Sequence, residues 1–284
     1  MEQLATGYGL IEGPVWDDQR GLLFSDVTFG GVFAVTGQGA VSTVFEHRRG
    51  IGGMTQHVSG QGLVVSGRNI AFKPFDDGPT VEILGQPDTN GGVGFNDITA
   101  DNHGRIYAGE LGESPFADAP TGRAGRLWCI EPDGAARVVA EDVLLTNGLA
   151  FSPDDRVLYH SDSRRNAVMA YDVFEDGSLG PKREWATTTD GAPDGLVVSE
   201  DGAVWVALAG GSGVAVFGAD GKEKRRITIP APMCTSVCFG GPDLRQLYIV
   251  SGSEGAGTDR GGAVWVIDTE VAGLPVAPAT TVLA

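Results

Sequence analysis

Six segments of the chain repeat one pattern: a polar or small residue, a short apolar strand, a turn, and a second apolar strand. The first residues of these segments, here called the lead residues, are Glu12, Gly52, Asn96, Asn147, Asp194 and Thr235. Successive lead residues are 40, 44, 51, 47 and 41 positions apart. A repeat of about 40–50 residues that contains only strands is typical of propeller blades. The sequence therefore predicts an all-β fold, a six-bladed β-propeller.

Six such units fill the chain, so we expect one propeller domain over residues 1–284. The expected blades span approximately 12–45, 50–85, 95–143, 146–188, 192–231 and 234–270. Glycine occupies 44 of the 284 positions without a fixed period, which favours many short strands joined by tight turns. A β-sandwich or a pair of β-domains is the alternative. One terminus is expected to lend a strand that closes the ring, and the pattern does not say which.

The longest interval between lead residues contains the segment 112–125, "GESPFADAPTGRAG", which has no apolar alternation. Loops of this length either cover functional sites or extend from the surface. Both readings stay open: a lid over one face of the propeller, or a plain surface insertion.

Charge and patterning exclude several classes of partner. The formal net charge of −17 disfavours nucleic acids and anionic membrane surfaces. The chain begins without the basic and apolar regions of a secretory signal, and no apolar run approaches the ~20 residues of a membrane span. We expect a cytoplasmic protein, monomeric or a small homo-oligomer, that acts on a small molecule.

The lead residues are expected to gather around the axis, because the first strand of every blade runs in the same direction. Glu12, Asn147 and Asp194 each bring a side-chain oxygen there. Two neighbouring carboxylates stay ionised cheaply only around a positive charge. Oxygen ligands with two negative charges suit one divalent metal ion, calcium first, with zinc, manganese or iron(II) as alternatives. The competing interpretation places Asn147 in a turn and both carboxylates on solvated loops.

The second strands return to the same face, so their last residues form an outer ring around the lead residues. Asp26 and Asp162 belong to this ring, and we expect them to hold waters or the substrate. Asp162 has an alternative role as a turn residue after its strand.

The phrases "EGPVW", "FND", "TNGLAFSPD", "PDGL" and "TSVCFGG" resemble the senescence marker protein (regucalcin), gluconolactonase and luciferin-regenerating-enzyme family. The resemblance covers nearly the whole chain in order. It implies a six-bladed propeller with one divalent metal at the axis, and lactone hydrolysis as the activity. It places Glu12, Asn147 and Asp194 on the metal ligands and Asn96 on a substrate contact. It also suggests Glu110 or Glu113 as an acidic substrate contact.

One position departs from the family pattern. Sugar-lactone hydrolases of the family often have an arginine two residues before the substrate-contacting asparagine, where this chain has Gly94. Without that guanidinium, a polyhydroxylated sugar loses a multidentate donor. A less polar lactone or another ester therefore becomes a plausible substrate.

These observations predict a metal-dependent lactone hydrolase in which Asp194 is also the general base that takes a proton from water. Two other function classes stay open. One is a different enzyme on the same scaffold, such as a phosphotriesterase-like hydrolase, an isomerase or a hydratase. The other is a calcium-binding propeller without catalysis.

Overall fold

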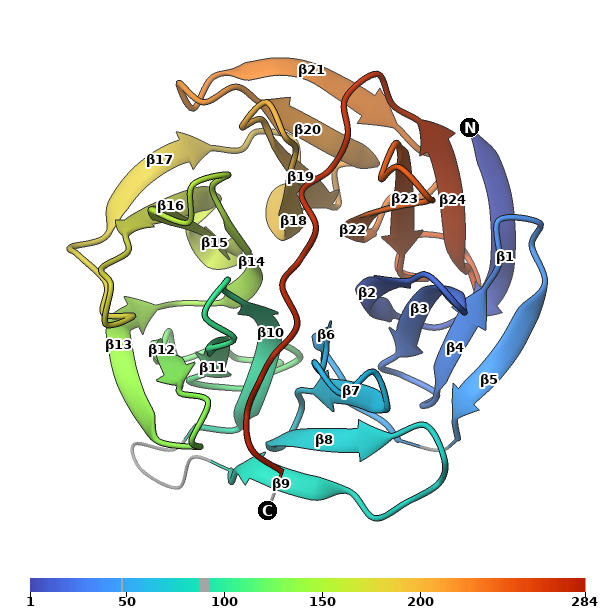
Figure 1. Ribbon diagram of the computed structural model, residues 1–284. Coiled ribbons are helices and arrows are strands. Elements are labelled where there is room, and N and C mark those ends of the chain that lie inside the picture. Colours follow the sequence, from blue (N-terminus) through green and yellow to red (C-terminus); the bar gives the residue numbers. More distant parts are fainter. Residues whose placement is uncertain (47, 87–91, 284) are drawn as a thin grey trace.

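The computed structural model describes residues 1–46, 48–86 and 92–283. In this part of the chain, six four-stranded antiparallel sheets are arranged around a central axis (Figure 1). The architecture is a six-bladed β-propeller, as the repeat predicts.

The blades are numbered in chain order, and their strands are given from the axis outward. Blade 1 contains β2 (Ile11–Asp17), β3 (Gly21–Asp26), β4 (Val32–Val35) and β5 (Val41–Phe45), and blade 2 contains β6 (Met54–Gln56), β7 (Gly62–Val65), β8 (Ile70–Pro74) and β9 (Val81–Leu84). Blade 3 contains β10 (Gly94–Ala100), β11 (Ile106–Leu111), β12 (Gly125–Ile130) and β13 (Ala136–Val143), and blade 4 contains β14 (Thr146–Phe151), β15 (Val157–Asp162), β16 (Ala167–Asp172) and β17 (Arg183–Thr187). Blade 5 contains β18 (Ala192–Val198), β19 (Val204–Ala209), β20 (Gly213–Phe217) and β21 (Glu223–Thr228). Blade 6 contains β22 (Cys234–Gly240), β23 (Gln246–Ser251), β24 (Gly262–Asp268) and β1 (Glu2–Tyr8).

The N-terminus closes the ring. Strand β1 pairs antiparallel with β24, with Thr6 opposite Ala263, and forms the outermost strand of blade 6. The last blade is therefore built from both ends of the chain. The closure that the repeat left open is made by the first strand and not by the last.

Apolar side chains fill the spaces between neighbouring blades. Trp205 of blade 5 packs edge-on against Phe239 of blade 6, with ring centroids 5.3 Å apart. Trp16 of blade 1 stacks on Tyr248 of blade 6 at 5.4 Å. Full burial of one large apolar side chain contributes about 1.5–3 kcal/mol, so these layers hold the blades around the axis.

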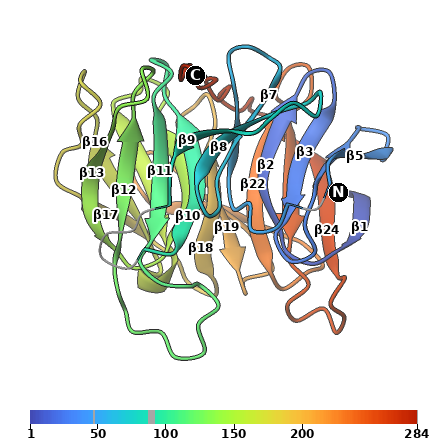
Figure 2. The same ribbon diagram turned by 90° about the horizontal axis from the view of Figure 1, so that it is seen from below.

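The two faces of the propeller differ. We call the face on which the inner strands begin the front face, and the opposite face the tail face. In Figure 2 the loop between β11 and β12 extends from the front face, and the C-terminal tail lies on the opposite side. Figure 1 shows this tail crossing the middle of the tail face from β24 towards β9. Leu274 N donates to Val198 O at one end of the crossing, and Ala279 N donates to Gln56 O at the other.

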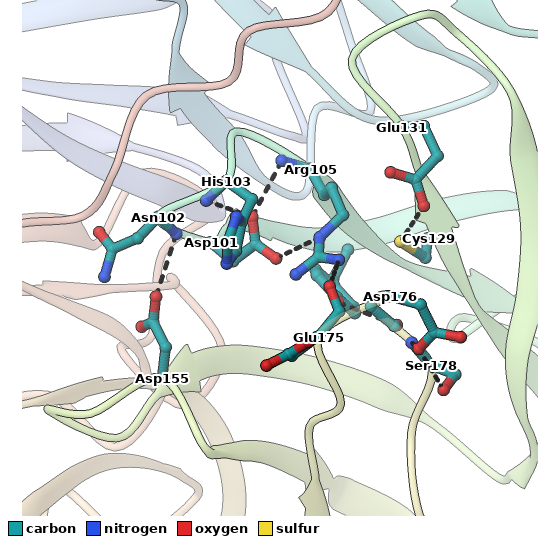
Figure 3. A network of polar contacts seen from close by, with 12 residues as sticks. Asp101, Asn102, His103, Arg105, Cys129, Glu131, Asp155, Glu175, Asp176 and Ser178 are labelled. Carbon is teal, nitrogen blue, oxygen red and sulfur yellow. Dashed lines mark hydrogen bonds and ion pairs between the residues drawn. The ribbon is translucent and has the colours of Figure 1, made fainter.

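A polar network on the tail face joins blades 3 and 4 (Figure 3). Arg105 Nε donates to Asp101 Oδ2 at 2.6 Å, and Arg105 Nη1 donates to the carbonyl oxygen of Glu175 at 2.8 Å. Asn102 N donates to Asp155 Oδ2 at 3.1 Å. The buried ion pair thus has partners for both charges and fixes the spacing of two blades.

One turn of 3-10 helix, Ser163–Arg165, is the only helical segment in the described residues. No helix in that part of the chain has the length and apolar character to span a membrane.

Candidate metal and substrate site

A β-bulge recurs where the inner strands begin. In blades 1, 3, 4, 5 and 6 the inner strand has one residue more than its neighbour, for example between Thr146 and Leu149 of β14. Bulges bend a strand locally and redirect side chains, and they are frequent beside active sites. The lead residues of these five blades therefore lie in or beside equivalent irregularities at the front end of the channel.

The Asn147-Gly148 pair is part of a strand and not of a hairpin turn. Both residues lie inside β14. A Cβ on Gly148 would stand 2.3 Å from Leu196 N and 2.7 Å from Asp194 O, so a side chain there would collide with blade 5. Glycine at this position permits the close approach of two inner strands. That approach brings the bulges with Asn147 and Asp194 next to each other.

Hydrogen bonds connect the asparagines of blades 3 and 4. Asn96 Nδ2 donates to Asn147 Oδ1 at 2.6 Å and to the carbonyl oxygen of Thr146 at 2.8 Å. Asn147 Nδ2 donates to Ser163 Oγ at 2.8 Å. The side-chain oxygen of Asn147, Oδ1, therefore faces Asn96. The side-chain oxygen of Asn96 takes no part in these hydrogen bonds.

Two of the lead residues, Glu12 and Asp194, are buried carboxylates that influence each other's ionisation. Glu12 is 8% exposed and Asp194 is 4% exposed. Burial raises the pKa of Glu12 well above its ordinary value, and the charges of Asp194 and Asp97 raise it further. Burial and the charge of Asp97 also raise the pKa of Asp194. Three acidic groups that oppose one another's ionisation create a strong local demand for positive charge.

One oxygen of Asp194 has no partner. Asp194 Oδ1 is buried and makes no hydrogen bond in the structure. A buried charged acceptor without a partner is costly, so this atom lies where a ligand of opposite charge would be stabilised. The sequence predicts that this oxygen shares one cation with the side-chain oxygens of Glu12 and Asn147, and such an oxygen-only donor set would have two formal negative charges. This set fits a hard divalent cation such as calcium.

Among the described residues, no three His, Cys, Asp or Glu side chains are grouped as ligands of one metal. The proposed set differs from such a group because it combines two carboxylates with an amide. Neutral amide oxygens are common calcium ligands, and waters or substrate supply the remaining positions of six to eight.

Asp97 is a functional candidate that the sequence reasoning missed. It follows Asn96 on the bulge of β10, and burial raises the pKa of its carboxyl to about 7. It lines a cavity of about 500 Å³ in the axial channel. The cavity lies beyond the lead residues, between them and the tail, and Leu274 is one of the tail residues that line it. The signal in the sequence was the acidic residue directly after a lead residue.

The outer-ring aspartates organise backbone. Asp26 Oδ2 accepts from Gly9 N at 3.0 Å, and Asp26 Oδ1 accepts from Thr28 N at 3.0 Å. The two carboxylate oxygens of Asp162 accept from Leu144 N and Leu145 N at 3.0 and 3.1 Å. Both aspartates are almost fully buried and hold the segments that lead into the inner strands. Contact with substrate remains a prediction for each of them.

The two glutamates of blade 3 have different surroundings. Glu110 is buried, and its carboxylate accepts from Arg126 Nε at 2.7 Å and from Trp128 Nε1 at 2.6 Å. Glu113 lies in the loop after β11, where the hydroxyl of Thr121 donates to it at 2.6 Å and Arg164 pairs with it. The hydrogen bonds from Thr121 contribute most to lowering the pKa of Glu113 to about 2. Contact with substrate remains a prediction for both carboxylates.

Gly94 cannot be replaced by a larger residue without a change of backbone. Its φ is +141°, and a Cβ there would stand 2.6 Å from the carbonyl oxygen of Gly67. Phe95 N donates to the same oxygen at 2.6 Å. An arginine at position 94 would therefore require a different packing of blades 2 and 3 at this point.

The sequence model of one family matches residues 10–253, from the first inner strand to the last blade. The chain belongs to the SMP-30/gluconolactonase/LRE-like family. Its front-face asparagines and carboxylates lie within the matched region.

Two curated relatives and one solved structure illustrate the similarity. The 6-deoxy-6-sulfogluconolactonase of Pseudomonas putida is 39% identical over 164 residues, which are 56% of this chain and 54% of that relative. Pentonolactonase XacC of Haloferax volcanii is 29% identical over 287 residues, covering 95% of this chain and 94% of the relative. A luciferin-regenerating enzyme superimposes with a TM-score of 0.86 at 25% identity, over 97% of both chains.

Proposed function

We propose that the protein is a lactone hydrolase with a divalent cation held by Glu12, Asn147 and Asp194, and that calcium is the first candidate for this cation. The observation that supports this most is the buried pair Glu12 and Asp194, whose carboxylates oppose each other's ionisation while Asp194 Oδ1 has no partner. The names of the two relatives, a sulfogluconolactonase and a pentonolactonase, support lactone hydrolysis as the reaction.

When bound, a divalent cation at this position supplies Lewis acidity that stabilises negative charge on a carbonyl oxygen and lowers the pKa of water. The side chains of this protein would move the proton and orient the substrate. The carboxylate of Asp194 has two oxygens, so one can hold the cation while the other accepts the proton of the attacking water as general base. Cleavage of the ester bond then yields a hydroxy acid.

Asn96 has a narrower role in this mechanism than a general polar contact. Both bonds of its Nδ2 go to protein oxygens, one on Thr146 and one on Asn147. The atom left for substrate is therefore Oδ1, which accepts a hydrogen bond. Asn96 can orient a substrate hydroxyl, and it cannot donate to a carbonyl oxygen without giving up one of its present bonds.

The same front-face geometry supports a proposal about the substrate class. The backbone at Gly94 leaves no space for an arginine, so the donors that such a side chain would give a sugar are missing there. Small lactones with few hydroxyls and sugar lactones are both members of the proposed class, and we rank the less polar lactones first. We further propose that the protein acts in the cytoplasm, as a monomer or small homo-oligomer, without nucleic-acid or membrane partners.

The test uses the full-length protein, stripped with a chelator and reloaded with calcium. Aliphatic lactones and sugar lactones are added separately, and acid release is followed with a pH indicator. We expect acid release that needs calcium and that is lost in Asp194→Ala. Calcium binding without acid release from any lactone of the panel would contradict the hydrolase and favour a propeller that only binds calcium.

A further inference from the structure

The Ser163 hydroxyl lies between the two blades that carry Asn147 and Asp194. Ser163 Oγ accepts from Asn147 Nδ2 at 2.8 Å and donates to the carbonyl oxygen of Pro193 at 2.6 Å. Pro193 directly precedes Asp194 in β18. Ser163 is 7% exposed, so water does not compete for these bonds. One hydroxyl therefore contacts the side chain of one proposed ligand and the backbone beside another.

The direction of these hydrogen bonds follows from counting protons. A hydroxyl has one proton to donate, and a carbonyl oxygen can only accept. The proton of Ser163 therefore goes to Pro193 O, and Ser163 Oγ can only accept from the side chain of Asn147. Asn147 must then present its NH2 group to Ser163. Its side-chain oxygen is left pointing the other way, towards Asn96.

A second pair of contacts fixes the same orientation from the opposite side. Asn96 Nδ2 donates to Thr146 O, which again can only accept, so this end of the Asn96 side chain is the NH2 group. The same group donates to Asn147 at 2.6 Å, and the atom that receives this bond must be the oxygen of Asn147. Both neighbours of Asn147 thus require one and the same rotamer of its amide.

The backbone holds Ser163 in place. Ser163 N donates to Leu145 O at 3.0 Å, and Ser163 opens the single turn of 3-10 helix that follows β15. The carboxylate of Asp162 binds the backbone N–H groups of Leu144 and Leu145 on the way into β14. These hydrogen bonds therefore hold the segment that carries the Ser163 hydroxyl against the start of β14.

We infer that Ser163 is a positioning residue for cation binding: it keeps the carbonyl oxygen of Asn147 aimed at the axis and couples that oxygen to the strand that carries Asp194. This inference rests on the proposed cation site. Side chains that orient metal ligands typically change metal affinity by about 10–100-fold when they are replaced. Without Ser163 the amide of Asn147 loses one of the two contacts that distinguish its oxygen from its nitrogen.

The experiment measures calcium affinity by calorimetry on the chelator-treated full-length protein. We expect Ser163→Ala to bind one calcium ion with a Kd about 10–100-fold higher than wild type. Ser163→Thr keeps the hydroxyl and should recover most of the affinity. The matched control is Ser161→Ala, because Ser161 Oγ lies in the same segment, is buried, and makes no hydrogen bond. This control should bind calcium like the wild type.

The outcomes separate this inference from the proposed function. If wild type binds calcium and Ser163→Ala binds it equally tightly, the positioning role is overturned and the cation site stands. A lower melting temperature of metal-free Ser163→Ala with an unchanged Kd has the same meaning, because it shows a structural role alone. If wild type binds none of calcium, manganese and zinc, the cation site itself is wrong and the positioning role falls with it.

A second variant covers the case in which Ser163→Ala does not fold. Asn147→Asp adds a negative charge to the cation site but offers no N–H group to Ser163 Oγ. We expect it to bind calcium at least tenfold more weakly than wild type, in spite of the added charge. Equal or tighter binding would overturn the inference.

Discussion

Replacing Asp194 by asparagine should have opposite effects on the metal-free and the calcium-loaded protein. In the metal-free protein, the Asp194 carboxylate is buried near Glu12 and Asp97, and its Oδ1 has no partner. Asparagine has nearly the same shape and no charge. The substitution therefore removes an unfavourable charge from the folded state and a ligand from the cation site.

The magnitude follows from the charge on the buried carboxylate. The amide of asparagine is buried at the same place, so the gain is only the part of the desolvation cost that comes from the charge; we take it as about 1–3 kcal/mol, the range for one unsatisfied buried polar group. Domains of 150–250 residues gain about 2–4 °C in Tm per kcal/mol, which gives an increase of about 2–12 °C for metal-free Asp194→Asn. In wild type, calcium at 100 times its Kd adds about 2.7 kcal/mol to the free energy of unfolding. The variant should lose most of that gain.

The effect has a definite sign with pH. Because the folded-state pKa of Asp194 is raised, the native protein binds protons more tightly than the unfolded chain. The metal-free stability of wild type therefore falls as the pH rises from the ordinary carboxyl range through the raised pKa. The advantage of Asp194→Asn should be greatest above that pKa and should shrink towards pH 4.

Differential scanning calorimetry, with chelator and with calcium and at several pH values, measures these changes in Tm. Asp26→Asn is the control, since the carboxylate of Asp26 has backbone N–H partners and its loss should destabilise the protein in both conditions. The reasoning would be refuted if Asp194→Asn melted below wild type in chelator. It would also be refuted if the variant kept the full calcium-induced rise in Tm.

Three further predictions concern single side chains. Gly148→Ala should lose at least about 1–3 kcal/mol of stability and weaken calcium binding, because its Cβ would stand 2.3 Å from Leu196 N. Gly37→Ala is the control: its Cβ would have open space, so neither its stability in a urea titration nor its calcium binding should change. Burial lowers the pKa of His160 to about 4, so stability should fall as the pH drops from about 6.5 towards 4. From pH 7 to pH 5, His160→Gln should lose about 2 kcal/mol less than wild type, and equal losses would show that His160 does not titrate in the fold. Arg164→Gln removes the cationic partner of Glu113 and should speed proteolysis within 112–124 while the calcium Kd stays unchanged. Proteolysis at the wild-type rate would mean that the ion pair does not hold the loop.

The sequence was sufficient to predict the propeller fold and the positions of the lead residues. Each blade repeats one strand pair and its turn, so the spacing of residues such as Asn96 and Asn147 indicates where successive blades begin. Pairing between β1 and β24 joins the two ends of the chain, and no local pattern encodes it. That is why the closing strand could not be assigned in advance.

The detail of the site depends on contacts between blades, which a pattern within one blade does not contain. The glycine after Asn147 is typical of turns, and only the approach of blade 5 explains it. Simple alternation would place Asp97 away from Asn96, but the bulge in β10 changes the register there. Ser163 bonds to Pro193 across a blade boundary, so its role appears only with the fold.

The cation site can be tested most directly by anomalous diffraction from crystals of the chelated protein soaked in manganese. We predict one strong peak on the axis at the front face, within coordination distance of the carboxylates of Glu12 and Asp194 and of the side-chain oxygen of Asn147. A map without a peak there, or with its strongest peak bound by other residues, would contradict the cation site and the lactonase mechanism built on it.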